Sequence, residues 1–184
     1  ALYAAGPVSI YKTPLFTGSF IILPCGNRII CANYQTNQLR WEVFLKSSDS
    51  GYNFKNTEMC MNASTVFMAY ADYLAPEGTT KHISKLVAID VVTGKIKWTV
   101  NLFDFAVNGD QFSNPVCTEQ TVYLPVEHQL IAFNAQTGAV QWNFRALSNT
   151  AASLVNPAYA GDKIFVSSGT DSLFSVNRNT GARI

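Results

Sequence analysis

A fifteen-residue pattern occurs three times in this chain of 184 residues, and most of a fourth copy follows. Each copy has an apolar strand, Asn or Asp, three further residues, Gly or Asn at a turn, and a second short strand. The copies are IICANYQTNQLRWEV at 29–43, LVAIDVVTGKIKWTV at 86–100, LIAFNAQTGAVQWNF at 130–144 and LFSVNRNTGARI at 173–184. Strands repeated in this way restrict the chain to an architecture built from one recurring unit.

The spacing of the copies identifies that unit. Equivalent Thr residues lie 57, 44 and 43 residues apart, at Thr36, Thr93, Thr137 and Thr180. A period of about 40–50 residues with turn-linked strands is typical of a β-propeller, with one four-stranded blade per repeat. We therefore predict one all-β domain, 1–184, of about four antiparallel blades. These blades fall roughly at 10–45, 56–101, 111–146 and 153–184, and the last lacks its outer strand.

The residues that recur are interpreted as structural. Gly takes the positive φ that a short turn requires, and an Asn or Asp four residues earlier can hydrogen-bond the turn backbone. One Trp in the same place of each blade is what packing between blades needs. The structural residues predicted in this way are Trp41, Trp98, Trp142, Gly94, Gly138, Gly181 and Asp90.

Composition excludes two classes of partner. Only 14% of the residues are charged and the formal net charge is +1, so no basic stripe is present to bind nucleic acid. The longest apolar runs, such as Phe20–Leu23, have the length of a strand, so no membrane-spanning segment is predicted.

The four cysteines are predicted to be unpaired. With a two-residue turn at Gly26 and Asn27, Cys25 and Cys31 lie on opposite faces of one hairpin, where a disulfide is not expected. Cys60 and Cys117 are placed on the innermost strands of neighbouring blades, as small buried apolar residues. Free thiols favour a reducing compartment, whereas the acceptor triplet at Asn62 favours a secretory one.

The sequence shows no motif for a catalytic, cofactor-binding or metal site. His128 beside Glu127 reads as a solvated turn, with an acid–base pair as the alternative. The second copy carries an insertion, Asp72–Ser84, and an insertion in one repeat maps to a loop on one face, where binding is often located. We predict a partner-binding loop there, formed by Tyr70, Tyr73, Leu74 and His82.

The repeat resembles that of the pyrroloquinoline-quinone (PQQ), or quinoprotein, propeller superfamily, whose blades carry Ala-x-Asp-x-x-Thr-Gly-x-x-x-Trp. Ala88, Asp90, Thr93, Gly94 and Trp98 match this pattern position for position. The 132–142 segment matches it with one change, and the similarity covers nearly the whole chain.

The resemblance implies three alternative functions. Quinoprotein dehydrogenases hold the quinone between a Trp and a disulfide of adjacent cysteines, with a calcium ion nearby; this chain has no adjacent cysteines. Non-catalytic members bind polypeptides, among them a periplasmic lipoprotein of the outer-membrane barrel-assembly machinery and the lumenal domains of unfolded-protein sensors. We predict a non-catalytic scaffold without cofactors that binds a protein or peptide. A fragment of a PQQ- and calcium-dependent dehydrogenase and a lumenal unfolded-protein sensor are the alternatives.

The resemblance also implies a ring of eight blades, of which about four are encoded here. Four such blades form an open arc, and we expect a second propeller half to complete it, supplied by another chain or by a homodimer. The family points to the periplasm, a secretory lumen or the extracellular space.

Overall fold

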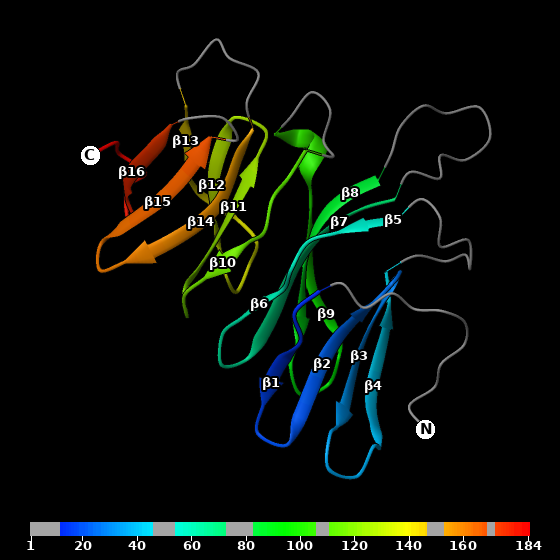
Figure 1. Ribbon diagram of the computed structural model, residues 1–184. Coiled ribbons are helices and arrows are strands. Elements are labelled where there is room, and N and C mark those ends of the chain that lie inside the picture. Colours follow the sequence, from blue (N-terminus) through cyan, green and yellow to red (C-terminus); the bar gives the residue numbers. More distant parts are fainter. Residues whose placement is uncertain (1–11, 46–53, 73–82, 106–110, 147–152, 169–171) are drawn as a thin grey trace, which may run out of the picture.

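The computed structural model describes residues 12–45, 54–72, 83–105, 111–146, 153–168 and 172–184. These residues form four antiparallel sheets that follow one another in an arc (Figure 1). In each sheet, hydrogen-bonded neighbours are also neighbours in the chain, apart from a split first strand in the second sheet. This is the meander of a propeller blade, and the predicted all-β fold of about four blades is confirmed.

Each blade contains three to five strands. Blade 1 comprises β1 (Leu15–Thr17), β2 (Phe20–Cys25), β3 (Arg28–Asn33) and β4 (Leu39–Phe44). Blade 2 comprises β5 (Phe54–Asn56), β6 (Cys60–Met61), β7 (Thr65–Asp72), β8 (Ile83–Asp90) and β9 (Ile96–Asn101), followed by the 3-10 helix η2 (Leu102–Asp104). Blade 3 comprises β10 (Val116–Cys117), β11 (Thr121–Val126), β12 (Gln129–Asn134) and β13 (Val140–Arg145). Blade 4 comprises β14 (Leu154–Ala160), β15 (Lys163–Ser168) and β16 (Leu173–Asn177).

The insertion in the second copy is partly strand. Ala71 pairs with Ser84 and Asp72 pairs with Ile83, so β7 and β8 are each eight residues long, against six for β11 and β12. The expectation that Asp72 and Ser84 belong to a loop is therefore wrong. Residues 73–82 lie outside the described part of the chain.

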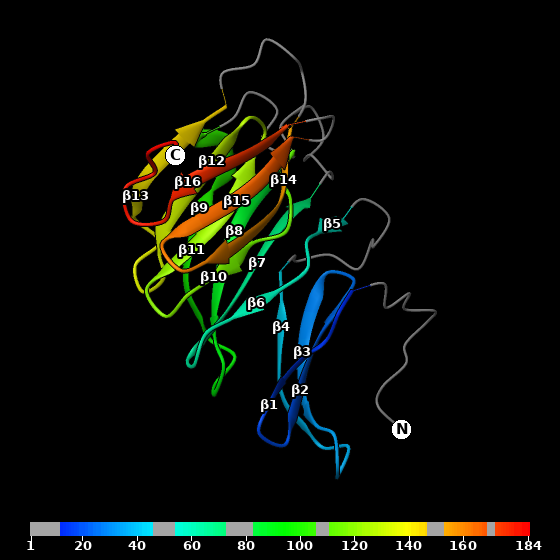
Figure 2. The ribbon, with the colours of Figure 1, turned by 60° about the vertical axis from the view of Figure 1, so that its left-hand side comes forward.

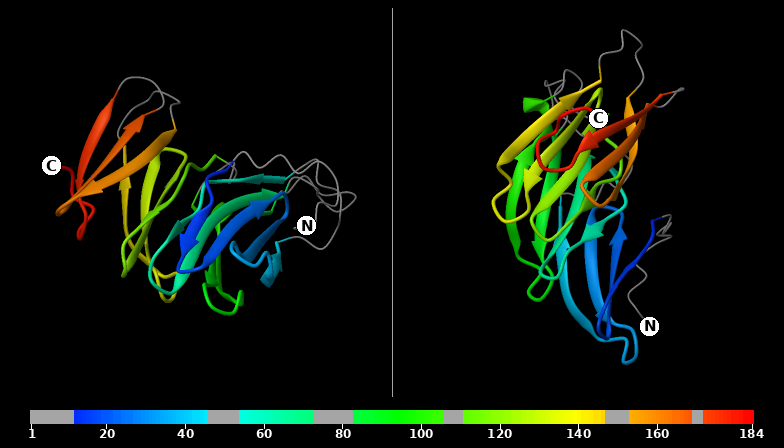
Figure 3. Two further views of the ribbon diagram at one scale, coloured as in Figure 1. Left: turned by 60° about the horizontal axis from the view of Figure 1, so that its bottom comes forward. Right: turned by 90° about the vertical axis from the view of Figure 1, so that its left-hand side faces the viewer.

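The core lies between the blades, as Figures 2 and 3 show for the stacked sheets. Three apolar clusters fill the spaces between successive blades. Every residue of β7 and β11 is buried, because both faces of a middle blade pack against a neighbour. In β2 and β15 buried and partly exposed residues alternate over much of the strand, because each belongs to a blade with only one packed face.

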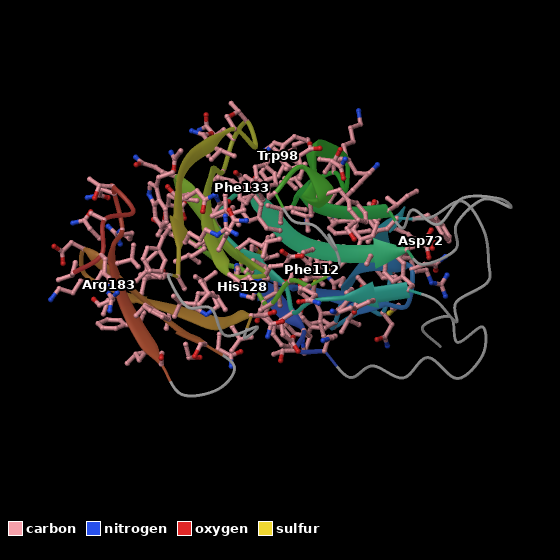
Figure 4. The ribbon with its side chains drawn as sticks, turned by 90° about the horizontal axis from the view of Figure 1, so that it is seen from above. Asp72, Trp98, Phe112, His128, Phe133 and Arg183 are labelled. Carbon is pink, nitrogen blue, oxygen red and sulfur yellow. The ribbon has the colours of Figure 1, made fainter. Side chains whose placement is uncertain are left out.

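A Trp from each of blades 1, 2 and 3 reaches the turn of the next blade. The indole N–H groups of Trp41, Trp98 and Trp142 donate to the carbonyls of Val91, Ala135 and Arg178, at 2.9, 3.1 and 3.1 Å. Figure 4 shows Trp98 in the region of Phe133, in the cluster between blades 2 and 3. The repeated Trp is thus both an apolar filler and a hydrogen-bond link between blades.

Candidate functional site

The predicted partner-binding loop is described only at its base. Tyr73, Leu74 and His82 fall outside the described residues, and their role stays a prediction. Tyr70 lies in β7, only 6% exposed, with its ring stacked on Phe54 at 5.3 Å. Burial, and then the charge of Asp72, raise the pKa of its hydroxyl to about 12. Tyr70 is therefore packed within blade 2 and offers little surface to a partner.

The Glu127–His128 turn, between β11 and β12, forms backbone hydrogen bonds with Gln111, Ala146 and Leu154. Glu127 has a φ of 50° and is 9% exposed; its N–H donates to the carbonyl of Gln111 and its carbonyl accepts from Leu154, each at 2.6 Å. The carbonyl of His128 accepts from Ala146 at 3.0 Å. Figure 4 shows His128 in the same region of the molecule as Phe112, which bridges to Val126. These backbone bonds make the turn a junction between strands.

A row of polar groups crosses the blades along their first strands. The N–H of Thr13 donates to the Glu58 carboxylate at 2.6 Å, and the N–H of Glu58 donates to Oδ1 of Asn114 at 3.0 Å. In blade 4 the N–H of Asn156 donates to the Ser113 hydroxyl at 3.3 Å. Hydrogen bonds thus join every successive pair of blades. The only carboxylate in this row, Glu58, accepts one of these bonds.

The position beside the Trp carries a polar, exposed residue in blades 1–3: Arg40, Lys97 and Gln141. The structure shows that these side chains reach across their own sheet to equivalent positions. Lys97 donates to the Thr65 hydroxyl at 2.9 Å, and the Thr121 hydroxyl donates to Gln141 at 3.0 Å. In blade 1 the guanidinium of Arg40 lies 4.3 Å from the centre of the Phe20 ring.

The three Trp residues of the repeat are each packed on one side by the next blade. A quinone sandwiched by Trp needs a free indole face, but Trp41, Trp98 and Trp142 lie against the Gly of the next blade. Two of these indoles also contact a ring of their own blade, Phe67 for Trp98 and Tyr123 for Trp142. Among the described residues no three His, Cys, Asp or Glu side chains gather as a metal-binding group.

One face of blade 1 is apolar and partly open to solvent. We call it the free face of blade 1. Register places its residues on the side of the sheet away from blade 2, because Ile22 and Cys31, on the opposite side, pack into the cluster shared with blade 2. The free face consists of Phe16, Ile21, Leu23, Ile30, Tyr34 and Phe44, with Arg28 and Glu42 at its border.

The free face has the composition of a blade interface. Ile21, Leu23 and Ile30 occupy the positions that Val122, Leu124 and Ile131 hold in blade 3, and those three are fully buried against blade 2. In blade 1 the same positions are only partly buried.

Aromatic rings and an ion pair complete the free face. Phe16 and Tyr34 are 60% and 46% exposed and meet edge to face, with ring centres 6.0 Å apart. Arg28 and Glu42 form an ion pair at 2.7 Å, and the Arg28 guanidinium lies 6.0 Å from the centre of the Phe44 ring. Exposed aromatic residues with a charged border are typical of protein-binding surfaces.

Sequence reasoning did not single out the free face. The signal was present in the alignment of the first and third copies, where Ile21 and Leu23 take the places of core residues. The sequence does not indicate that no described strand packs on this side of blade 1. The described residues also contain no helix able to cross a membrane.

Comparison with known proteins places the chain in a family. Residues 78–184 match the family model of the outer membrane protein assembly factor BamB, and this is more than half of the chain. The chain belongs to the BamB family. No curated protein matches the sequence.

Solved structures share the fold at low sequence identity. BamB from Moraxella catarrhalis is 15% identical, with a TM-score of 0.65, over 94% of this chain and 47% of that one. Quinohemoprotein alcohol dehydrogenase from Comamonas testosteroni is 12% identical, with a TM-score of 0.72, over 96% of this chain and 34% of that one. The computationally designed Ika4 protein is 11% identical, with a TM-score of 0.65, over 95% of this chain and 94% of that one. The chain thus spans about half of the BamB structure and a third of the dehydrogenase.

Proposed function

We propose that this protein is a non-catalytic propeller scaffold that binds a protein partner through the free face of blade 1. The observation that carries the proposal is the partial exposure of Ile21, Leu23 and Ile30 at positions that are fully buried in blade 3. A face of this composition fits an apolar β-sheet layer, because that is what the equivalent face of blade 3 packs against.

Membership of the family supports a polypeptide as the class of partner. The description of the family is that of an assembly factor for outer membrane proteins, and such a factor acts on other polypeptides. We assign the free face to a polypeptide with apolar β-strands, such as an outer membrane protein before it is folded. A periplasmic location agrees with this function.

The alternative is a segment of a quinoprotein dehydrogenase, which the structural similarity to quinohemoprotein alcohol dehydrogenases favours. Against it stand the three Trp residues, which the repeat itself uses. The sensor hypothesis rests on the sequence resemblance alone.

Binding to a labelled, urea-unfolded outer-membrane β-barrel protein, diluted into buffer, tests the proposal by fluorescence anisotropy. Replacing Phe16 and Tyr34 together by Ala should weaken binding at least about tenfold, because exposed aromatic residues dominate such interfaces. The control is Tyr159→Ala in blade 4, since Tyr159 is as exposed as Tyr34, at 46%.

Equal binding by the double variant and the control would contradict the proposal. So would saturable binding of pyrroloquinoline quinone and calcium that raises Tm, since a ligand that binds only the folded state stabilises it. Light scattering on the chain alone shows whether a second copy occupies the free face, in which case the double variant should be monomeric.

A further inference from the structure

Two cysteines from neighbouring blades face the same apolar cluster. In blade 2, Cys60 pairs with Phe67, and both side chains point to the side of blade 3. In blade 3, Cys117 pairs with Val122, and both point to the side of blade 2. The sequence predicts these two cysteines on innermost strands of adjacent blades. The structure adds that their side chains are directed toward each other's blade.

Hydrogen bonds hold the two strands side by side on both flanks of the cysteines. On one flank, the N–H of Glu58 donates to Asn114 at 3.0 Å. On the other, the Asn62 amide donates to the carbonyl of Glu119 and the N–H of Ala63 to its carboxylate, each at 3.2 Å. Residues 60 and 117 therefore lie within a segment where β6 and β10 are fixed relative to each other.

Within this segment both cysteine side chains lie in the apolar cluster between blades 2 and 3. Burial, and then a hydrogen bond with the Cys117 thiol, raise the pKa of Cys60 well above its usual range. Cys60 remains partly open to solvent, whereas Cys117 is buried. The position of Cys60 is occupied in blade 3 by Val116, which packs into the next cluster without any sulfur. Packing alone thus does not require a thiol at this position.

We propose that Cys60 and Cys117 are a site of oxidative modification that forms a disulfide between the inner strands of blades 2 and 3. The bond closes a loop of roughly 60 residues and links two inner strands that otherwise meet only through non-covalent contacts.

The oxidant is a small-molecule or protein disulfide. Cys60 is the more accessible of the two, and the small fraction of it present as thiolate attacks one sulfur of the oxidant and releases the other as a thiol, which leaves a mixed disulfide on Cys60. Because the raised pKa keeps the thiolate fraction small, this first step is slow at neutral pH. The Cys117 thiolate then attacks Sγ of Cys60 and expels the second thiol. The protein loses two protons and two electrons, and the oxidant takes up both as its disulfide becomes two thiols.

The test is incubation of the purified, reduced protein with oxidised glutathione at pH 7 and pH 8.5. Titration of thiols in denaturant should fall from four to two per chain, and mass spectrometry should find the peptides of Cys60 and Cys117 linked. The reaction should be faster at pH 8.5, where more thiolate is present. Oxidation should raise Tm by about 5–10 °C, reversibly on reduction.

Three variants keep the test decisive. The double variant Cys25→Ser with Cys31→Ser retains the pair and should still lose two thiols. Cys60→Ser and Cys117→Ser should each keep three thiols, or form only a mixed disulfide with glutathione. Retention of four thiols by the parent protein at pH 8.5, a stable mixed disulfide at Cys60, or linkage of any other pair would overturn the proposal.

Discussion

The turn of blade 1 and the turns of the other three blades close in the same way but are used differently. In all four, an Asn or Asp side chain accepts from the backbone two and three residues later, as Asn33 does at 2.9 Å twice. The residue that closes each turn has a positive φ, 57° for Asn37 and 72–74° for the glycines. Backbone closure therefore does not explain why three turns end in Gly and one in Asn.

The Trp of the preceding blade explains it. A Cβ added to Gly94 would lie 2.7 Å from Trp41, and one added to Gly138 would lie 2.8 Å from Trp98. Real Cβ atoms do not approach that closely. Asn37 carries a Cβ and is exposed, and it lies on the side of blade 1 that no described blade covers. Gly is thus required by the packed indole, and Asn is sufficient where no indole is packed.

Removing an indole should have the largest effect. Trp142→Ala should lower the free energy of unfolding by about 3–5 kcal/mol, because it removes the contact with Tyr123, the bond to Arg178 and the cover of Gly181. Urea denaturation followed by circular dichroism measures the change. A variant as stable as the parent that had lost partner binding would reverse the structural interpretation of this Trp.

Placing a side chain beneath an indole should have an intermediate effect. Gly138→Asn should destabilise the protein by about 1–3 kcal/mol, because the new Cβ forces Trp98 to move. The same denaturation experiment measures it.

The matched control is Gly161→Asn. Gly161 also has a positive φ, 58°, but its Cβ would meet nothing within 4 Å, so the change should stay below about 0.5 kcal/mol. The reverse substitution, Asn37→Gly, should be equally mild. Equal destabilisation at 138 and 161 would show that backbone conformation, rather than the indole, selects Gly.

We expect the smallest effect on stability from a change at Asp90, whose carboxylate accepts the hydrogen bonds in the turn of blade 2. The Thr93 hydroxyl, and then the Thr93 N–H, hold the pKa of Asp90 below its usual range. A lowered folded-state pKa stabilises the protein above the unfolded value of about 3.9, and this contribution is lost as the pH falls through the folded-state pKa.

Asp90→Asn should therefore leave stability at pH 7 within about 0.5 kcal/mol of the parent, since Asn serves in the other turns. Below about pH 4 the parent should lose stability relative to the variant. Denaturation curves at pH 7 and pH 3 measure both values. A difference between the two proteins that does not change with pH would count against this role of Asp90.

The fold class, the number of blades and the positions of the turns could be predicted from the repeat. This prediction was possible because the same local pattern occurs in every copy of the repeat: an apolar strand, a capping Asn or Asp, and a residue able to adopt positive φ. The sequence also separated Cys25 from Cys31 correctly, because strand alternation is a local property: Cys25 pairs with Arg28 and Cys31 with Ile22.

Contacts between residues of different strands or blades could not be predicted from the repeat, because they depend on how the blades pack together. Three findings concern residues from different strands or blades. Trp41 requires Gly at position 94, Cys60 and Cys117 share one apolar cluster, and Tyr70 is buried. The free face of blade 1 is a further example. The sequence pattern of Ile21 and Leu23 is that of core residues, but no described strand covers them. A local pattern fixes which face of a strand is apolar, but burial depends on which neighbour packs against that face.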